Sequence, residues 1–432
     1  MPQQYRSERC GPLRGRLRVP SDKSISHRAV MLGALADGST RVRGFLPGAD
    51  TLATLAAVQA MGVQVSRRAA GEVELTRDGP LRDPAAALDC GNSGTGLRLL
   101  TGLLAGQGVA AELTGDASLR RRPMQRIIDP LERMGARLAA APGGTAPLAL
   151  GRARLQGIHY ASPVASAQVK SCVLLAGLGA AGETRVSEPA PSRDHTERML
   201  RSFGYTVRQD ADGVSLHGGG ELYAAQIEVP ADISSAAFAL VAATIVPDSE
   251  VLLECVGINP TRTGILDVLR AMGADISLEN ARELGAEPVA DLRVRSAALR
   301  GIDVPPALVP LSIDEFPAIA VAAACAEGVT RVTGAAELRV KESDRIASVV
   351  AGLRAVGIDS EAFADGFTVA GGRLRAGEVQ SAGDHRIAMA FAVAGMIASE
   401  PVLIHDCDNV VTSYPGFVEQ MTALGARLHV HG

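Results

Sequence analysis

One arrangement of apolar and polar positions recurs six times along the chain. In each copy an amphipathic stretch ends in a glycine that is followed by a short β-like run, as in AVQAMGVQV and VLRAMGADI. The six glycines stand 68 to 84 residues apart, at Gly62, Gly135, Gly204, Gly273, Gly357 and Gly425. Because glycine readily adopts the left-handed conformation that ends a helix, this repeat predicts six helix–strand junctions, each with a glycine C-cap.

A second kind of segment alternates with the first and is apolar on nearly every side. Its six copies are AVMLGALADG, LLTGLLAGQG, VLLAGLGAAG, FALVAATIVPD, IAVAAACAEG and AMAFAVAGMIASE. A helix that is apolar all round is buried, and each copy is followed by a run typical of a strand, such as TRVRGF or PVLIHD. We therefore expect an α/β (α+β) repeat of polar loop, buried helix, strand, polar loop, amphipathic helix and strand.

Six such units in 432 residues favour two domains of three units each. The expected linker is EVPAD, residues 228–232, where a strand gives way to proline and a helix start. We expect an N-terminal domain over residues 20–230 and a C-terminal domain over residues 231–432 together with residues 1–19. The leading strand, Leu13 to Val19, precedes the first buried helix and is therefore expected to cross into the C-terminal domain.

Composition excludes several classes of protein. The net charge of −4 argues against a nucleic-acid binder, and an aromatic content of 3% without Trp removes the usual base-stacking platform. The longest apolar stretches run to about a dozen residues, against the roughly 20 that span a bilayer. The six cysteines lie at least 70 positions apart, which offers neither a metal knuckle nor a disulfide framework. We expect a cytoplasmic, monomeric enzyme that uses no metal and no cofactor.

Polar residues gather where the buried helices begin. The preceding loops read PSDKSISHR, CGNSGTGLR, ASAQVK, ADISSA, SIDEFP and GDHRIA. Helix N-termini attract anions. Ordinary N-capping accounts for the Ser and Asp residues there, but not for Lys23, Arg28, Gln168, Lys170 and Arg386.

Four of the loops before the amphipathic helices carry arginine, at Arg122, Arg193, Arg262 and Arg345. Guanidinium groups bind phosphate and carboxylate bidentately. If the units are pseudo-symmetric, these side chains converge on one cleft between the domains. A near-neutral protein with such a focused cationic site is expected to bind a phosphate-bearing metabolite, the alternative being dispersed surface salt bridges.

Acid and base candidates are few. Asp314 opens a buried helix, and Glu342 lies in an arginine-bearing loop. Each carboxylate could cap a helix, orient an arginine or remove a hydroxyl proton. His27, His195 and His385 are expected to be hydrogen-bonded residues at helix starts, because no metal-ligand spacing accompanies them.

The ordered motifs SDKSISHR, GNSGTGLR, RRRPM, ASAQVKS, SRDHTE, SIDEFP, RVKESDR and GDHRIAM resemble those of the EPSP synthase family, the 3-phosphoshikimate 1-carboxyvinyltransferases. The resemblance runs from near residue 13 to the C-terminus. It implies the inverse α/β enolpyruvyl transferase fold, with two domains of three βαβαββ units each. It also implies transfer of the enolpyruvyl group of phosphoenolpyruvate to the 5-hydroxyl of shikimate 3-phosphate, with release of phosphate, in the shikimate pathway.

The resemblance further implies a role for individual residues. Shikimate 3-phosphate is expected to contact Lys23, Ser24, Arg28, Ser166, Ala167, Gln168, Arg193, Asp314 and Lys341. Phosphoenolpyruvate is expected to contact Lys23, Gly94, Arg122, Gln168, Arg345 and Arg386. The implied catalytic residues are Lys23, Asp314 and Glu342, with Asp314 as proton acceptor and either Lys23 or Glu342 as proton donor.

Departures from the family pattern and rival families bear on this interpretation. Some members carry a lysine where this chain has Thr412 and Ser413, and members with alanine in place of Gly94 resemble a glyphosate-tolerant class, so we expect glyphosate sensitivity. The UDP-N-acetylglucosamine enolpyruvyl transferases usually have a reactive cysteine about where Ala117 stands. RNA terminal-phosphate cyclases require a nucleotidylated histidine and a basic face.

Overall fold

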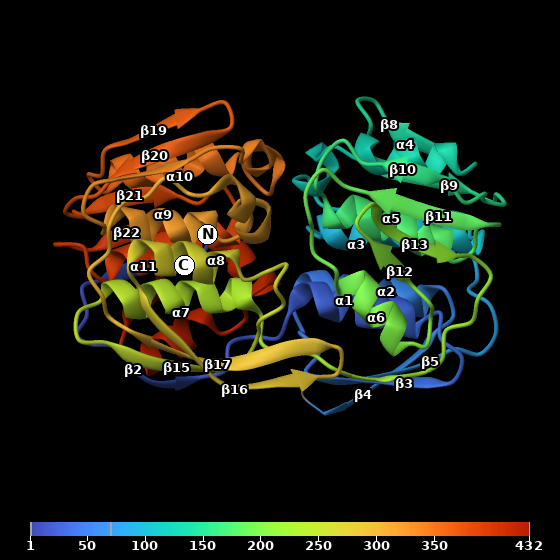
Figure 1. Ribbon diagram of the computed structural model, residues 1–432, viewed down its shortest axis with the longest axis horizontal. Helices are drawn as coiled ribbons and strands as arrows, with labels where there is room; N and C mark the ends of the chain where they lie inside the picture. Colours follow the sequence, from blue (N-terminus) through green and yellow to red (C-terminus); the bar gives the residue numbers. More distant parts are fainter. Residues whose placement is uncertain (1, 70, 432) are drawn as a thin grey trace. The chain divides into compact units, whose positions relative to one another are not determined.

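The computed structural model describes residues 2–69 and 71–431, which contain twelve α-helices of two alternating kinds (Figure 1). Six helices are buried almost all round and coincide with the six apolar segments, which confirms that prediction. They are α1 (Lys23–Gly33), α3 (Gly94–Gln107), α5 (Ala167–Gly177), α7 (Ile233–Ile245), α9 (Phe316–Ala324) and α11 (His385–Gly395).

The other six helices each precede one of the six glycines of the repeat. They are α2 (Ala49–Ala60), α4 (Gln125–Arg133), α6 (His195–Ser202), α8 (Gly264–Met272), α10 (Arg345–Ala355) and α12 (Phe417–Ala423). The predicted glycine lies one or two residues beyond each helix end, and all six have φ values between 79° and 112°. Gly273 is the C-cap of α8, and each of the other five glycines directly follows the C-cap residue, so a left-handed glycine at each helix end is confirmed.

Six small sheets surround the buried helices, five of them mixed and the three-stranded one antiparallel, and each contains one of the six expected strands. Three of the sheets have the strand orders β14 (Gln226–Glu228)–β3 (Ser39–Arg43)–β5 (Glu72–Thr76)–β4 (Gln64–Ala69), β6 (Leu88–Asp89)–β7 (Ala111–Thr114)–β9 (Thr145–Gly151)–β8 (Arg137–Ala141) and β10 (His159–Ala161)–β11 (Glu183–Ser187)–β13 (Gly213–His217)–β12 (Arg208–Asp210). The other three are β2 (Arg14–Leu17)–β15 (Glu250–Gly257)–β17 (Glu287–Arg295)–β16 (Asp275–Leu284), β18 (Val329–Val332)–β20 (Gly366–Ala370)–β19 (Ser360–Phe363) and β21 (Gly377–Gln380)–β22 (Val402–His405)–β1 (Gln4–Glu8)–β23 (Arg427–His431).

Two leading strands are exchanged along the chain. Strand β2 directly precedes α1 but pairs in parallel with β15, whereas β14 directly precedes α7 but pairs in parallel with β3. Strand β1, which the periodicity did not predict, pairs antiparallel with both β22 and β23. The N-terminal residues thus complete the sheets of the fourth and sixth repeats.

The chain forms two compact units, each with its own hydrophobic core. One unit comprises the residues up to Pro20, Pro230–Glu283 and the residues from Glu287 onward; the other comprises Ser21–Val229 with Leu284–Ala286. In the first, α7, α9 and α11 contact one another, and in the second, α3 packs against α1 and α5. In both, Figure 1 shows the sheets outside the buried helices.

Glycine permits the close packing of α3 on α5. A Cβ on Gly102 would lie 2.2 Å from the carbonyl oxygen of Cys172, and a Cβ on Gly106 would lie 2.6 Å from that of Ala176. Both distances are far inside van der Waals contact, so a larger residue would push the helices apart. The polar N-terminal residues of α3 and α5 are held near each other by this packing.

Candidate active site

The start of α1 carries Lys23 on a capped helix end. Asp22 caps the helix by accepting a hydrogen bond from the backbone N–H of Ile25 at 2.8 Å. Lys23 is the first helical residue, and its Nζ lies 3.0 Å from Oδ2 of Asp50 in α2. The carboxylate of α2 therefore holds the lysine at the helix start, where the sequence predicted a substrate contact.

Arg28 lies one turn further along α1 and is 3% exposed. Its Nε donates to Oγ1 of Thr196 at 2.7 Å, its Nη2 to Oγ of Ser171 at 2.7 Å, and its Nη1 to the carbonyl of Ser24 at 3.0 Å. These partners come from α6, α5 and α1. The plane of the guanidinium group is thus fixed by three helices, and Ser24 lies directly beside it.

The start of α3 brings together Gly94, Arg98 and Arg122. A Cβ built on Gly94 would lie 3.0 Å from Nη1 of Arg98 and 3.2 Å from Nη1 of Arg122. Arg98 Nη1 also donates to Oε1 of Gln168 in α5 at 2.6 Å, and Arg122 Nη2 donates to Oδ1 of Asn92 at 2.5 Å. The structure therefore gathers three predicted residues, Gly94, Arg122 and Gln168, around a second arginine that the sequence analysis did not assign.

The start of α5 supplies Ser166, Ala167 and Gln168. Ser166 is the N-cap: its Oγ accepts from the N–H of Val169 at 3.5 Å. Arg193 is half-buried in the loop that leads into α6. The predicted residues between positions 23 and 193 thus stand at the N-terminal ends of α1, α3 and α5 or in the loops that follow them in the repeats.

In the other unit, Asp314 lies just before α9 and is surrounded by cations. Its Oδ1 lies 3.3 Å from Nη1 of Arg345 and 3.9 Å from Nζ of Lys341. Its Oδ2 lies 3.9 Å from Nη2 of Arg386, whose Nη1 donates to the Asp314 carbonyl at 3.1 Å. Four predicted residues from different segments therefore form one cluster.

Arg345 joins the fifth predicted residue, Glu342, to this cluster. Its Nη2 lies 2.6 Å from Oε2 of Glu342, and its Nε lies 2.8 Å from Oδ2 of Asp384. Burial opposes the charge of this arginine, but the carboxylates of Asp384, Glu342 and Asp314 outweigh burial and raise the pKa of Arg345 above its ordinary value. In this structure the guanidinium group is 1% exposed and its three nitrogens face carboxylates.

Two members of these clusters, Arg98 and Asp384, were not among the predicted site residues. Arg98 follows Gly94 by one helical turn within CGNSGTGLR, so helical spacing could have placed it beside the glycine. Asp384 caps α11 by accepting from the N–H of Arg386 at 2.9 Å. The ordinary capping signature concealed its second contact, with Arg345.

His27 is completely buried in α1. Its Nδ1 lies 2.8 Å from Oγ1 of Thr54, and its Nε2 lies 3.3 Å from Oγ of Ser93, the N-cap of α3. Burial lowers the pKa of His27 to about 3, and nearby Lys23 and Arg28 act in the same direction. The histidine is a neutral hydrogen-bonding residue, as expected from the sequence.

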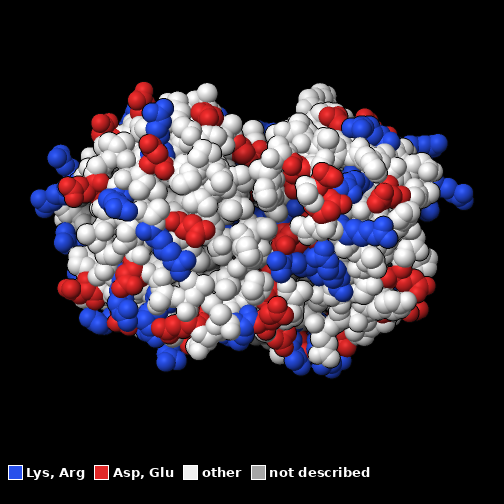
Figure 2. Space-filling model, in the orientation of Figure 1, with Lys and Arg blue, Asp and Glu red and all other residues white. Residues whose placement is uncertain are grey.

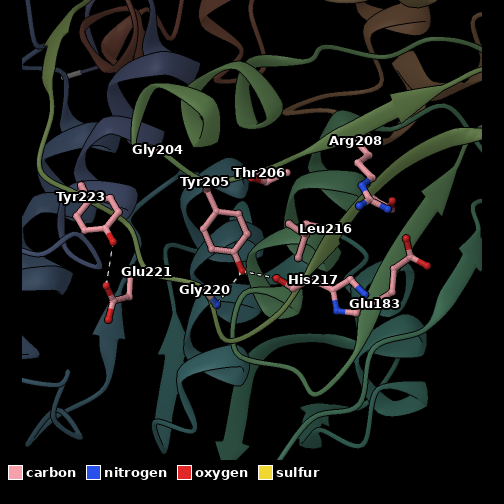
Figure 3. Close-up of a pocket in the computed structure, with 11 residues that line it drawn as sticks. Glu183, Gly204, Tyr205, Thr206, Arg208, Leu216, His217, Gly220, Glu221 and Tyr223 are labelled. Carbon is pink, nitrogen blue, oxygen red and sulfur yellow. Dashed lines mark hydrogen bonds between the residues drawn. The ribbon is translucent and has the colours of Figure 1, made fainter.

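A separate hollow of about 320 Å³ lies beside the end of α6 (Figure 3). Its walls include the rings of Tyr205 and Tyr223, whose hydroxyls contact the carbonyl of His217 and Oε2 of Glu221. None of the predicted site residues lines it. This hollow therefore has no part in the clusters described above.

The wider surface and the described residues add three findings. Acidic and basic side chains are interspersed on the face drawn in Figure 2, as expected for a net charge of −4. Among residues 2–69 and 71–431, no three His, Cys, Asp or Glu side chains are grouped as a metal site would require. No helix in the same part of the chain has the length and apolar character needed to cross a membrane.

Comparison with known proteins decides the family. The family model for EPSP synthase (3-phosphoshikimate 1-carboxyvinyltransferase) matches residues 8–421. The chain belongs to the EPSP synthase family. Two curated relatives named 3-phosphoshikimate 1-carboxyvinyltransferase are similar over nearly their whole length: that of Alkalilimnicola ehrlichii is 60% identical over 97% of this chain and 95% of its own, and that of Methylococcus capsulatus is 58% identical over 97% of both.

Solved structures agree with this family assignment. An EPSP synthase from Acinetobacter baumannii superposes with a TM-score of 0.89 at 50% identity and covers 100% of both chains. The enolpyruvyl transferase NikO from Streptomyces tendae has a TM-score of 0.80 at 17% identity, covering 100% of this chain and 99% of its own, and so shares the fold. The fold class expected from the sequence is confirmed.

Proposed function

We propose that the protein transfers the enolpyruvyl group of phosphoenolpyruvate to the 5-hydroxyl of shikimate 3-phosphate and releases phosphate. Its curated relatives carry the name 3-phosphoshikimate 1-carboxyvinyltransferase, which agrees with this proposal. The observation that carries the proposal is the cluster around Asp314. This carboxylate lies within 4 Å of cationic nitrogens of Lys341, Arg345 and Arg386, and a carboxylate so placed can accept a hydroxyl proton from a bound substrate. Small anionic substrates suit the cationic residues that surround it.

The chemistry requires a proton at one carbon and a base at one hydroxyl. Protonation of the methylene carbon of phosphoenolpyruvate makes its neighbouring carbon electrophilic, and the substrate hydroxyl attacks there while Asp314 takes the hydroxyl proton. The adduct then loses phosphate and a methyl proton, which restores the carbon–carbon double bond. Glu342 and Lys23 are the two candidates for the proton donor, and a carboxylate near the cationic carbon stabilises it.

Substrate placement is assigned to the cationic residues. We assign Arg122, Arg345, Arg386 and Lys23 to phosphoenolpyruvate, with Gly94 and Gln168 beside them. For shikimate 3-phosphate we assign Lys23, Ser24, Arg28, Ser166, Ala167, Gln168 and Arg193, and for its ring hydroxyls Asp314 and Lys341. The three-helix clamp on Arg28 supports this assignment, because an immobile guanidinium group loses little entropy when it binds phosphate.

A sugar-nucleotide acceptor is less well supported by the residues present. Ala117 stands about where UDP-N-acetylglucosamine enolpyruvyl transferases usually carry a reactive cysteine. Cys90 is buried, and burial raises its pKa to about 12, so its thiol stays protonated near neutral pH. Shikimate 3-phosphate is therefore the proposed acceptor.

The decisive experiment measures phosphate release from phosphoenolpyruvate with each acceptor in turn. We expect release with shikimate 3-phosphate and none above background with UDP-N-acetylglucosamine. The product is identified by mass spectrometry as the acceptor plus one carboxyvinyl group. Phosphate release with UDP-N-acetylglucosamine as acceptor, and none with shikimate 3-phosphate, would overturn the proposal. Gel filtration of the same sample tests the further proposal that the protein is a monomer.

A further inference from the structure

A buried group of three charged side chains lies behind the start of α5. Nζ of Lys170 is 3.0 Å from Oε2 of Glu188 and 3.0 Å from Oε1 of Glu197. The side chains of Lys170, Glu188 and Glu197 are 7%, 8% and 1% exposed. The proposed reaction uses none of them directly, so their place in the fold needs another explanation.

The group joins two segments that carry assigned substrate contacts, the start of α5 and the loop with Arg193. Glu188 follows β11, and its Oε1 accepts the backbone N–H of Ser166, the N-cap of α5, at 2.8 Å. Ser192, next to Arg193, donates its hydroxyl to Glu188 at 2.7 Å and accepts from Lys170 Nζ at its carbonyl oxygen at 3.2 Å. Glu188 therefore ties the helix start to the loop that presents Arg193.

The first turn of α6 extends the same connection to Arg28. Glu197 contacts Lys170, and the preceding residue, Thr196, accepts from Arg28 Nε at 2.7 Å and donates to Oγ of Ser171 at 2.7 Å. Two successive residues of α5 thus hold two successive residues of α6. Through them, α1, α5 and α6 are fixed relative to one another at the ends that carry Arg28, Ser166 and Arg193.

Stability alone does not account for this arrangement. Burial opposes the charge on Lys170, but Glu197 and Glu188 outweigh it and keep the pKa of Lys170 above its ordinary value. Among the described residues, Oε2 of Glu197 is buried and has no hydrogen-bond partner, which is unfavourable for folding. An apolar set of similar volume would avoid that cost, whereas it would not hold the Ser166 N–H and the Ser192 hydroxyl in place.

We infer that Glu188 is a positioning residue for the phosphate-bearing acceptor. Its carboxylate holds the N-terminus of α5 and the Arg193 loop at the spacing that the phosphate group requires. The inference rests on the proposed function, because it concerns the site assigned to shikimate 3-phosphate. Lys170 neutralises the Glu188 carboxylate at the helix start, where an unpaired negative charge would repel phosphate.

The test compares Glu188→Ala with Glu188→Gln and with a matched control, Glu183→Ala. Glu183 begins the strand that Glu188 follows, and it pairs with the exposed His159 at 3.5 Å. We expect Glu188→Ala to raise KM for shikimate 3-phosphate about tenfold, with kcat and KM for phosphoenolpyruvate within about twofold of wild type. Glu188→Gln keeps an acceptor oxygen for the Ser166 N–H and is expected to recover most of the loss, and Glu183→Ala is expected to match wild type.

Several outcomes would overturn the inference. The first is an unchanged KM for shikimate 3-phosphate in Glu188→Ala. The second is a fall in kcat of that variant by the same factor by which the KM values for both substrates rise. The third is a Glu188→Gln variant as impaired as Glu188→Ala. If Glu188→Ala does not fold, Ser192→Ala takes its place, because it removes the hydroxyl that links the Arg193 loop to Glu188. An unchanged KM in Ser192→Ala then counts against the inference.

A second measurement separates this inference from the proposed function. Amide hydrogen exchange followed by mass spectrometry reports the order of residues 166–170 and 188–194 without any substrate. We expect faster exchange in both segments of Glu188→Ala and not of Glu183→Ala. If wild type lacks the proposed activity but these segments loosen, the function is wrong and the positioning geometry stands; unchanged exchange contradicts the positioning role itself.

Discussion

Adding one methyl group at Gly94 should weaken phosphoenolpyruvate binding and leave the fold intact. Gly94 is the first residue of α3, and its backbone is compatible with alanine, which favours helices more than glycine does. The added Cβ would lie 3.0 Å from Nη1 of Arg98 and 3.2 Å from Nη1 of Arg122. Both guanidinium groups must therefore move by a few tenths of an ångström, and one of them, that of Arg122, is assigned to phosphoenolpyruvate.

The magnitude follows from the cost of overpacking. Inserting one methyl group into a filled site typically costs about 1–3 kcal/mol, which corresponds to about 5- to 150-fold in an equilibrium constant. Since the crowding concerns the phosphoenolpyruvate side, we expect KM for phosphoenolpyruvate to rise within that range while KM for shikimate 3-phosphate stays within about twofold. Glyphosate should inhibit wild type strongly and Gly94→Ala more weakly, because the methyl group occupies the same space.

Gly96→Ala provides a matched control for this prediction. It adds the same methyl group in the same helical turn, where the nearest atoms are Oγ of Ser93 at 3.0 Å and Oγ1 of Thr54 at 3.1 Å. It should disturb the α3 cap and lower Tm, with a smaller effect on KM for phosphoenolpyruvate. Equal increases in KM for the two variants, or equal glyphosate inhibition of wild type and Gly94→Ala, would refute the argument from the two arginines.

Two further predictions concern charge and pH. Lys23→Met should abolish turnover and lower the free energy of unfolding by about 3 kcal/mol, because it leaves the buried Asp50 carboxylate without the lysine. Arg122→Ala should also abolish turnover but lower the free energy of unfolding by only about 1 kcal/mol. Phosphate-release assays and urea titration check both variants, and a Lys23→Met variant as stable as wild type would contradict the pairing with Asp50. The pKa of His27 is about 3 in the folded protein and 6.5 in the unfolded chain, so between these values only the unfolded chain binds a proton at this histidine. The free energy of unfolding therefore decreases as pH falls below 6.5, by about 2 kcal/mol at pH 5 relative to pH 8. Urea titrations of wild type and His27→Asn at the two pH values should show this pH dependence only in wild type.

Periodicity was sufficient to predict the repeating elements because both halves of each repeat have an unambiguous local cause. An all-apolar helix can only be buried, and a glycine with positive φ at Gly62 or Gly425 marks a helix end wherever it lies in the fold. Strand exchange has no such local cause. The crossing of the leading strand was expected only from its place before the first buried helix, and β2 pairs with β15. Strand β1 was not expected, because its pairing with β22 joins residues more than 390 positions apart, which a local pattern does not encode.

Residues of the candidate site could be predicted where a charged side chain lies on an otherwise apolar helix. They could not be predicted where the residue type is also common for structural reasons, such as capping a helix. Lys23 and Arg386 are unusual on buried helices and were therefore noticed. Asp384 and Glu188 were not, since an aspartate before a helix and a glutamate after a strand are unremarkable in sequence. Their contacts with Arg345 and with the N–H of Ser166 exist only once distant segments are packed together.

Asp384 also couples the two arginines assigned to phosphoenolpyruvate in its unit. Its Oδ1 caps α11 at the N–H of Arg386, and its Oδ2 accepts from Arg345 Nε at 2.8 Å and from Ser343 at 3.1 Å. One carboxylate therefore sets both the start of the helix that carries Arg386 and the plane of the Arg345 guanidinium group. Arg345→Lys disturbs this carboxylate and with it the start of α11, whereas Arg386→Lys keeps the backbone N–H that Asp384 caps. The two side chains also share the carboxylate of Asp314. The effects of Arg345→Lys and Arg386→Lys on kcat/KM for phosphoenolpyruvate should therefore not add. A double-mutant cycle measures that coupling, and strict additivity would show that the shared carboxylate does not transmit position between them.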